Sequence, residues 1–467
     1  MKNKKFFENM KRLFNPESVA VIGASNKFDK LGFHVMKSLT TGGYKGKIIP
    51  VNPSAKEIMG IKAYPSISAY SGSIDLAIIA VPARFVFQIF DECHEKDVGG
   101  VVLITAGFRE IEDPEGAKNQ EILKQKADSY GIPVIGPNTF GMINFWHNLN
   151  ASFTPEFSLT KKGDIALVSQ SGGMSHLLSF LSQRHDVGYS KIVGIGNRLN
   201  VDFYEMLLFL KDDPHTKVIA LYIEGIDNPM PMIRAIKDMH KSKPVVAYKT
   251  GSSKSSNLAS KSHTGSMAGR YEIYIGALRQ AGAIVVNTAE ELMDTAKALS
   301  QSSIPDGNRV AVLSGQAGPG IAASDMAERV GLELPPFTEK TQKRINELLP
   351  PMAIRTNPVD MGPAWYDASA TREIIDVAMR DENIDAVILL IMYASANIKA
   401  VEGIKEMLLE WKQRKPIITC ISAPAGIWDK EVSFLEENKA LTNYPSPERA
   451  AQALGNLWEY KKILLQG

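Results

Sequence analysis

Short apolar runs rich in β-branched residues recur along the chain and alternate with amphipathic stretches of helical period. In the first third of the chain, these runs are residues 18–23, 47–51, 76–81, 100–105 and 133–136. Their length is that of buried strands, and their alternation with helices is the signature of βαβ units around a parallel sheet. The longest run, near residues 386–392, is too short to span a bilayer. The sequence therefore predicts an α/β protein.

Two segments interrupt this alternation and divide the chain into three units. Residues 144–163 are rich in polar, aromatic and proline residues, and residues 300–308 contain serine, proline and glycine. A chain of 467 residues has room for about three domains of ordinary size. We therefore expect domains at residues 1–143, 144–300 and 301–467.

The composition excludes several classes of protein. The net charge of +2 is spread along the chain without an arginine-rich stripe, so no nucleic-acid surface is expected. Cys93 and Cys420 lack metal-ligand spacing, which predicts reduced packing residues in a cytoplasmic protein and no metal site. Residues 1–14 lack the features of a secretory signal and are expected to form an exposed first helix. No membrane partner is expected.

The second and third units begin with the same pattern, at residues 163–173 and 308–318. In each, a strand runs into a Ser/Gly turn and then into a helix, whose first N–H groups and macrodipole favour an anion. A Ser/Gly turn that only caps a helix, without binding an anion, would have the same sequence pattern. The predicted phosphate-binding residues are Ser169, Gln170, Ser171, Gly172 and Gly173 in the second unit and Gly315, Gln316, Ala317 and Gly318 in the third.

The first unit places its ligand candidates at the ends of its predicted strands. The turn at residues 20–25 departs from G-x-G-x-x-G, and Asn52-Pro53 stands where an acidic residue would hold the ribose of NAD. Both features disfavour NAD, whereas coenzyme A would fit this edge of the sheet. The predicted cofactor-binding residues are Gly23, Ala24, Ser25, Asn52, Pro53, Val81, Pro82, Ala106, Gly107 and Asn138.

One histidine, His263, lies in a loop of small residues after the polar run at residues 251–260. A neutral imidazole nitrogen can attack phosphorus without another base, and flexible neighbours would let the ring travel. An ordinary loop histidine would fit this local pattern as well.

The ordered motifs resemble the succinyl-CoA synthetase superfamily. The first unit carries, in the order found in the family's CoA-binding domain, the motifs VIGAS, NP, VP, TAGF and GPN. The second unit carries, in the order found in the family's second domain, the motifs SQSGG, GN, YIEG and SHTG. The third unit, with SGQAG and NPVD, resembles a domain that succinyl-CoA synthetase carries on its other subunit. All three on one chain is the arrangement of the alpha subunit of ADP-forming acyl-CoA synthetases.

The resemblance implies a fold and an activity. It implies a Rossmann-like CoA-binding domain followed by two flavodoxin-like doubly wound domains. The first of these two, which is the second domain of the chain, would carry the phosphohistidine loop. The reaction would be acyl-CoA + ADP + phosphate = carboxylic acid + CoA + ATP, through an acyl phosphate and a phosphohistidine. His263 would be the phosphorylated residue. Glu224, at the end of an apolar strand, would hold its other ring nitrogen.

The resemblance also implies a partner, because the chain has no Walker sequence and no pair of acidic residues recognisable as a site for Mg²⁺ and ADP. An ATP-grasp beta subunit would bind Mg²⁺ and ADP or ATP in an α2β2 heterotetramer. The alternative function is a CoA-binding regulatory module related to protein acetyltransferases, which would not need His263 and Glu224 together.

Overall fold

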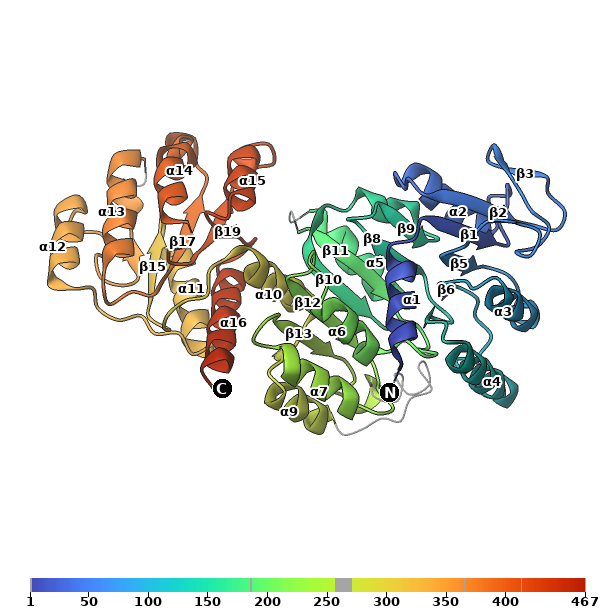
Figure 1. Cartoon of the computed structure of the whole chain (residues 1–467). Coiled ribbons are helices and arrows are strands. Elements are labelled where there is room, and N and C mark those ends of the chain that lie inside the picture. The colour runs from blue at the N-terminus through green and yellow to red at the C-terminus, as the bar shows by residue number, and fades with distance from the viewer. Residues whose placement is uncertain (1, 185–186, 257–270, 365, 413, 467) are drawn as a thin grey trace. The chain divides into compact units, whose positions relative to one another are not determined.

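The computed structural model describes residues 2–184, 187–256, 271–364, 366–412 and 414–466. The chain separates into two compact units, Met1–Asn287 and Thr288–Gly467. Over the described residues, the first unit contains two large sheets and the second contains one (Figure 1). No helix in these ranges is both long enough and apolar enough to cross a bilayer.

The first sheet is parallel and has the strand order β2-β1-β5-β6-β7. Every residue of β1, β5 and β6 is buried, which explains why these strands read as uninterrupted apolar runs. A short antiparallel pair, β3 (Glu57–Ile58) and β4 (Ile61–Lys62), follows β2. The large strands are β1 (Ser18–Ile22), β2 (Lys47–Val51), β5 (Leu76–Ile79), β6 (Gly100–Leu103) and β7 (Val134–Ile135), and the helices are α2 (Leu31–Thr41), α3 (Val86–Glu95) and α4 (Pro114–Tyr130).

The second sheet has the order β14-β13-β12-β10-β11-β8-β9, in which the hairpin β8–β9 is antiparallel to the rest. The segment 144–163, expected to be a boundary, therefore contains strand β9. The strands are β8 (Gly141–Asn144), β9 (Leu149–Ser152), β10 (Lys162–Ser169), β11 (Tyr189–Gly194), β12 (Val218–Ile223), β13 (Val245–Lys249) and β14 (Ile284–Val286), and the helices are α5 (Gly172–Ser182), α6 (Phe203–Lys211), α7 (Met230–Met239) and α9 (Tyr271–Gln280).

The third sheet forms the second unit and has the order β16-β15-β17-β18-β19. Helix α10 (Ala289–Gln301) packs here against α16 (Pro447–Leu465), with Arg449 bonded to both oxygens of Asp294 at 2.7 and 2.8 Å. The sequence placed this helix in the preceding domain. The other elements are β15 (Val310–Ser314), β16 (Val359–Asp360), β17 (Ala386–Met392), β18 (Ile417–Ser422), β19 (Thr442–Asn443), α11 (Ala317–Arg329), α12 (Glu339–Leu348), α13 (Ala368–Arg380), α14 (Ala400–Trp411) and α15 (Asp429–Glu437).

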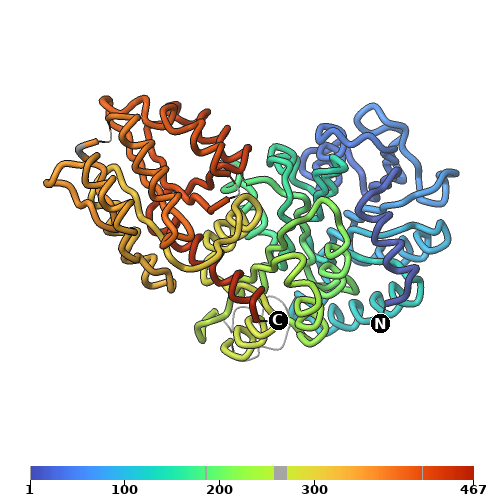
Figure 2. The backbone as a smooth tube through the Cα atoms, turned by 60° about the vertical axis from the view of Figure 1, so that its left-hand side comes forward, coloured from blue at the N-terminus to red at the C-terminus, as the bar shows by residue number. Residues whose placement is uncertain are grey.

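Helix α1 (Lys4–Phe14) joins the two sheets of the first unit (Figure 2). Phe6, Met10, Leu13 and Phe14 on its apolar face are buried, and Phe14 stacks on Phe209 of α6 with ring centroids 4.5 Å apart. On the first-sheet side, Asn9 Nδ2 donates to the carbonyl oxygen of Gly131 at 2.9 Å. The expectation of an exposed helix was wrong, because it is mainly the polar face that meets solvent.

All three sheets share one strand order. When the parallel strands of each sheet are numbered in chain order, their order across the sheet is 2-1-3-4-5. In such sheets, ligands bind beyond the carboxyl ends of the two central strands, where the connections diverge to opposite sides. These points are β1/β5, β10/β12 and β15/β17. The predicted α/β class, with a Rossmann-like sheet and two flavodoxin-like sheets, is confirmed.

Both cysteines are buried and free, as predicted for packing residues. Burial raises the pKa of the Cys420 thiol to about 11, with a smaller contribution from Glu448. Such a thiol is inert at neutral pH.

Candidate functional site

A cavity of about 830 Å³ lies at the switch point of the first sheet, beyond β1 and β5. It gathers residues that the sequence placed at separate strand ends. The predicted residues that line it are Gly23, Ser25, Asn52, Val81, Pro82 and Ala106. Ala24 lies within the same turn, fully buried, and Pro53 follows Asn52 with its side chain exposed.

The glycine turn after β1 depends on two close backbone approaches. Gly23 has φ +87°, and a Cβ there would lie 2.5 Å from the carbonyl oxygen of Ala80. A Cβ on Gly32 of α2 would lie 1.9 Å from the oxygen of Gly23. The two residues therefore serve the tight turn and the close helix packing that glycines provide in dinucleotide folds.

Asn52 shapes this turn from the neighbouring strand. Its Nδ2 donates to the oxygen of Ala24 at 2.9 Å, while its Oδ1 accepts from the backbone nitrogens of Ser54 and Ala55 at 2.8 and 3.1 Å. The side chain thus supports the walls of the cavity.

Lys27 and Lys30 also line this cavity, and sequence reasoning missed them. They are exposed and follow the glycine turn directly, which was the available signal. Two cations beside the start of α2 fit a ligand that carries phosphates.

The turn at Gly107 is arranged differently from the prediction. Gly107 and Phe108 both donate their backbone N–H groups to the carboxylate of Glu110. Asn197, in the second domain, donates to the other oxygen of Glu110 and accepts a bond from Asn138 at 3.3 Å. These bonds tie the two sheets together, so the N–H of Gly107 is committed to Glu110.

A second cavity, of about 610 Å³, lies between the loops of the first sheet and the switch point of the second. It brings together predicted residues of both domains, namely Ala106, Asn138, Gln170, Gly172, Gly173 and Glu224. The two cavities share Leu31, Thr105 and Ala106 as lining residues, so they adjoin each other.

The N-terminus of α5 faces this second cavity. Ser171 caps the helix by accepting the N–H of Met174 at 3.3 Å, and the buried Ser169 hydroxyl accepts the N–H of Ser171 at 3.1 Å. A Cβ on Gly173 would have no heavy atom within 4 Å, and one on Gly172 would meet only the Phe140 ring at 3.7 Å. The first helical turn thus leaves open space beside N–H groups that have no acceptor within the helix.

The corresponding turn in the compact unit Thr288–Gly467 repeats the contacts of Ser169, but its N-cap residue makes no side-chain bond to the helix. Ser314 accepts the N–H of Gln316 at 3.4 Å and donates to its carbonyl oxygen at 2.5 Å, and Gln316 occupies the N-cap of α11. Gly315 donates to Leu390 at 2.9 Å, as Gln170 does to Tyr222 at 3.3 Å. The predicted parallel between the turns is confirmed, and a phosphate contact at residues 315–318 stays a prediction.

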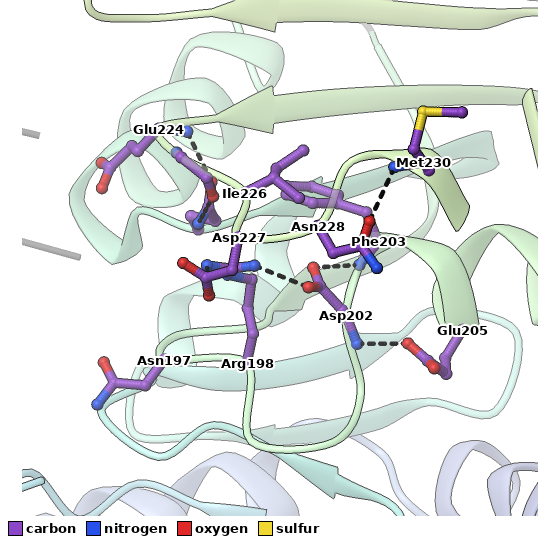
Figure 3. Close-up of polar contacts among 12 residues, drawn as sticks. Asn197, Arg198, Asp202, Phe203, Glu205, Glu224, Ile226, Asp227, Asn228 and Met230 are labelled. Carbon is purple, nitrogen blue, oxygen red and sulfur yellow. Dashed lines mark hydrogen bonds and ion pairs between the residues drawn. The ribbon is translucent and has the colours of Figure 1, made fainter. Parts of the chain in front are cut away.

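Glu224 stands directly after β12, half-buried at the head of a loop (Figure 3). Farther along this loop, the Asp227 carboxylate accepts from Arg198 at 3.2 Å and from Arg109 at 3.1 Å, and Arg198 also bonds Asp202 at 2.7 Å. Two arginines thus hold the loop that begins at Glu224. His263 lies outside the described residues, so its contact with Glu224 stays a prediction.

Comparison with known proteins decides the family. A CoA binding domain model matches residues 17–144, and a model of the succinyl-CoA ligase like flavodoxin domain matches residues 162–299. The alpha subunit of acetate–CoA ligase [ADP-forming] II from Pyrococcus furiosus is 39% identical, over 94% of this chain and 95% of that protein. This chain belongs to the alpha-subunit family of ADP-forming acetate–CoA ligases.

Other members of this acetate–CoA ligase family agree. Acetate–CoA ligase [ADP-forming] I of Archaeoglobus fulgidus is 37% identical over 97% of this chain, which spans 64% of that longer protein. The structure of acetyl-coenzyme A synthetase 1 of Ca. Korarchaeum cryptofilum in complex with phosphate and ADP has a TM-score of 0.88, at 32% identity over 98% of both chains. The resemblance drawn from the motifs is confirmed, and the subunit names imply a partner subunit.

One further residue of this ligase family member enters the second cavity from α5. His176 bonds the oxygen of Gly172 through Nδ1 at 2.7 Å and the hydroxyl of Thr154 through Nε2 at 2.8 Å. Its ring packs against Phe157 at 4.7 Å between centroids. With both ring nitrogens engaged, His176 forms part of the wall together with Phe140 and Phe153.

Within the described ranges, no three His, Cys, Asp or Glu side chains are grouped so that they could hold a metal ion.

Proposed function

We propose that this chain catalyses, as the alpha subunit, the first two steps of acyl-CoA + ADP + phosphate ⇌ carboxylic acid + CoA + ATP. One observation supports this most strongly. The cavity at the glycine turn of the CoA binding domain adjoins, at Leu31, Thr105 and Ala106, a second cavity that holds the α5 N-terminus and Glu224. A nucleotide with a long thioester arm, bound in the first cavity, would place its reactive end in the second.

In the first step, a phosphate oxygen attacks the thioester carbonyl carbon. The C–S bond breaks, CoA leaves as a thiolate that takes up a proton, and an acyl phosphate remains. The N–H groups of Gly172 and Gly173 would hold the phosphate and stabilise its charge, since fixed donors of this kind act without reorganisation. Losing one such donor typically costs on the order of 3 kcal/mol in the barrier.

In the second step, a ring nitrogen of His263 attacks phosphorus. The bond between phosphorus and the carboxyl oxygen breaks, which releases the carboxylate and leaves a phosphohistidine. The other ring nitrogen would donate its N–H to Glu224, whose negative charge would stabilise the cationic ring.

The third step would take place on a partner. An ATP-grasp beta subunit, assembled with this chain as α2β2, would bind Mg²⁺ and ADP and receive the phosphoryl group. The names of the Pyrococcus furiosus relatives as alpha subunits support a separate partner chain.

The test is covalent labelling of the assembled complex. Incubation with γ-labelled ATP and Mg²⁺ is expected to give acid-labile, base-stable phosphate on this chain, and none on a His263→Ala variant. Equal labelling of that variant would refute the assignment of His263. CoA binding without any labelling of the intact chain would favour a regulatory CoA-binding module.

A further inference from the structure

The turn formed by Glu224 and Gly225 is held by side chains at all four of its backbone polar groups. Gln170 Oε1 accepts the N–H of Glu224 at 2.6 Å and that of Gly225 at 3.1 Å, and its Nε2 donates to the oxygen of Gly225 at 2.8 Å. Lys249 Nζ donates to the oxygen of Glu224 at 2.8 Å. The dashed line at the Glu224 nitrogen in Figure 3 marks the first of these bonds.

Lys249 is an unusual residue for the buried end of an interior strand, β13. It pairs in register with Ile223, its side chain is almost fully buried, and its Nζ also donates to the oxygen of Thr250. The ammonium lies 5.4 Å from the centre of the Tyr274 ring. A buried cation persists only where bonds and a nearby charge compensate its desolvation, and here the bonds lead to the Glu224 turn.

The second unit provides an internal comparison, because its sheet has the same strand order. Ser169 pairs with Tyr222 and Ser314 with Leu390, so Met392 occupies the position of Glu224. Ile223 pairs with Lys249, while Ile391 pairs with Ile421.

Gly315 occupies the position of Gln170 in the matching turn. The fold therefore forms this turn and these strand ends with glycine, methionine and isoleucine. The trio of Gln170, Glu224 and Lys249 is present together in one sheet and absent from the other, which points to a role other than folding.

We propose that Gln170 and Lys249 are positioning residues, which fix the backbone of Glu224 so that its carboxylate meets the imidazole of His263. The inference rests on the proposed function. It also gives Gln170 a task different from the predicted phosphate contact, because both ends of its amide are engaged with the turn. A carboxylate held by a turn without these bonds would sample several orientations, and misplacement by about 1 Å can cost roughly a hundredfold in rate.

The experiment measures single-turnover phosphorylation of His263 by ATP in the complex with the beta subunit, and separately the KM for phosphate in steady-state turnover of acyl-CoA, ADP and phosphate. The variants are Glu224→Gln, Gln170→Met, their combination, Lys249→Met and Lys249→Arg. Gln183→Met is the matched control, since it removes one side-chain bond of the same type, to Thr160, at the far end of α5. Thermal melting and the affinity for CoA monitor the fold of each variant.

Gln170→Met is expected to lower the rate roughly 10- to 100-fold with the KM for phosphate unchanged, while Gln183→Met has no effect. The double variant should be no slower than Glu224→Gln alone, because both changes remove one interaction. Lys249→Met should behave like Gln170→Met, and Lys249→Arg should restore part of the rate.

Different failures have different meanings. A normal rate for Glu224→Gln would refute the proposed role of Glu224. If Glu224→Gln is slow, then additive effects in the double variant, or a raised KM for phosphate in Gln170→Met, would overturn the positioning role. If Gln170→Met does not fold, the same comparison of Lys249→Met with and without Glu224→Gln decides the question.

Discussion

Lys191 Nζ lies 2.5 Å from Asp213 Oδ2, and the two side chains are only 2% and 8% exposed. The hydroxyl of Thr216 donates to the same oxygen. This ion pair joins strand β11 to the segment after α6, inside the domain that carries Glu224. Its charges are removed from water, so each depends on the other for compensation.

We expect Asp213→Asn to reduce the free energy of unfolding by about 3–5 kcal/mol at pH 7, because it leaves the Lys191 charge buried without a counter-charge. Urea denaturation measures this loss. A Lys191→Met/Asp213→Asn double variant should recover part of it. A loss below about 1 kcal/mol would show that the pair contributes no more than a surface pair.

The same pair should make stability depend on acid. Burial alone would raise the pKa of Asp213, but hydrogen bonds from Lys191 and Thr216 outweigh it and hold the pKa below its ordinary value. A carboxyl with a lowered pKa stabilises the fold above its unfolded-state pKa of about 3.9, and this stabilisation is lost as pH falls through the folded-state pKa. The stability difference between the native protein and Asp213→Asn should therefore shrink below about pH 4, which melting curves from pH 7 to 3 would measure.

Gly32→Ala should damage the CoA site selectively. The added methyl group would overlap the oxygen of Gly23, so the turn must shift, at a cost of about 1–3 kcal/mol. We expect the Kd for CoA, measured by calorimetry, to rise about tenfold. Gly276→Ala, on the exposed face of α9 with open space around it, is the control and should leave CoA binding unchanged. Normal CoA affinity in Gly32→Ala would place the ligand away from this turn.

Gly173→Ala separates stability from phosphate binding. The methyl group would meet no protein atom within 4 Å, so the free energy of unfolding should stay the same or rise by up to about 1 kcal/mol. It would project into the proposed phosphate position, and the KM for phosphate should rise about tenfold while the KM for CoA stays constant. An unchanged KM for phosphate would show that the anion does not bind at the N-terminus of α5. The same substitution at Gly318 tests the second turn.

Alkaline pH should slow the phosphorylation of His263 through Lys249. Burial lowers the pKa of Lys249 to about 8, although the charge of Glu224, directly after β12, opposes this; among the described residues, the ring of Tyr274 on α9 also lies against its ammonium. Above pH 8 Lys249 loses its charge and its bond to the oxygen of Glu224 weakens, so the single-turnover rate should fall about fivefold between pH 7 and 9.5 with the KM for phosphate unchanged. Lys249→Arg keeps its charge and should show no such fall. A fall of equal size in Lys249→Arg would assign the effect to another group.

The local sequence pattern predicted the strands and ligand turns well, because a fully buried parallel strand reads as an unbroken apolar run. The hairpin β8–β9 escaped it, since Asn144, Asn150 and Ser152 are buried there and satisfied by hydrogen bonds. Asn144 donates to Phe14, 130 positions away. Bonds between positions so distant in the chain leave no trace in a local hydropathy pattern.

The candidate site shows the same difference between local features, which the sequence pattern reveals, and contacts between distant segments, which it does not reveal. The glycine turns after β1 and β10 and the strand-end position of Glu224 are local features, and the structure brings them to two adjoining cavities. Lys249 donates to the backbone oxygen of Glu224, 25 positions away, so nothing in its own neighbourhood marked it. The charges of Lys27 and Lys30 can be read from the sequence. Their position along the cavity cannot, because it depends on how the glycine turn folds.

The buried helix α1 has a consequence for substrate choice. Residues of both sheets in the first unit join with this helix in one continuous core. In the proposed function, the cavity that would bind the nucleotide and the α5 N-terminus that would hold the phosphate are therefore a fixed distance apart, and the pantetheine arm would act as a ruler between them. Thioesters built on a shorter thiol would fall short of the reacting phosphate, however well their acyl group fits.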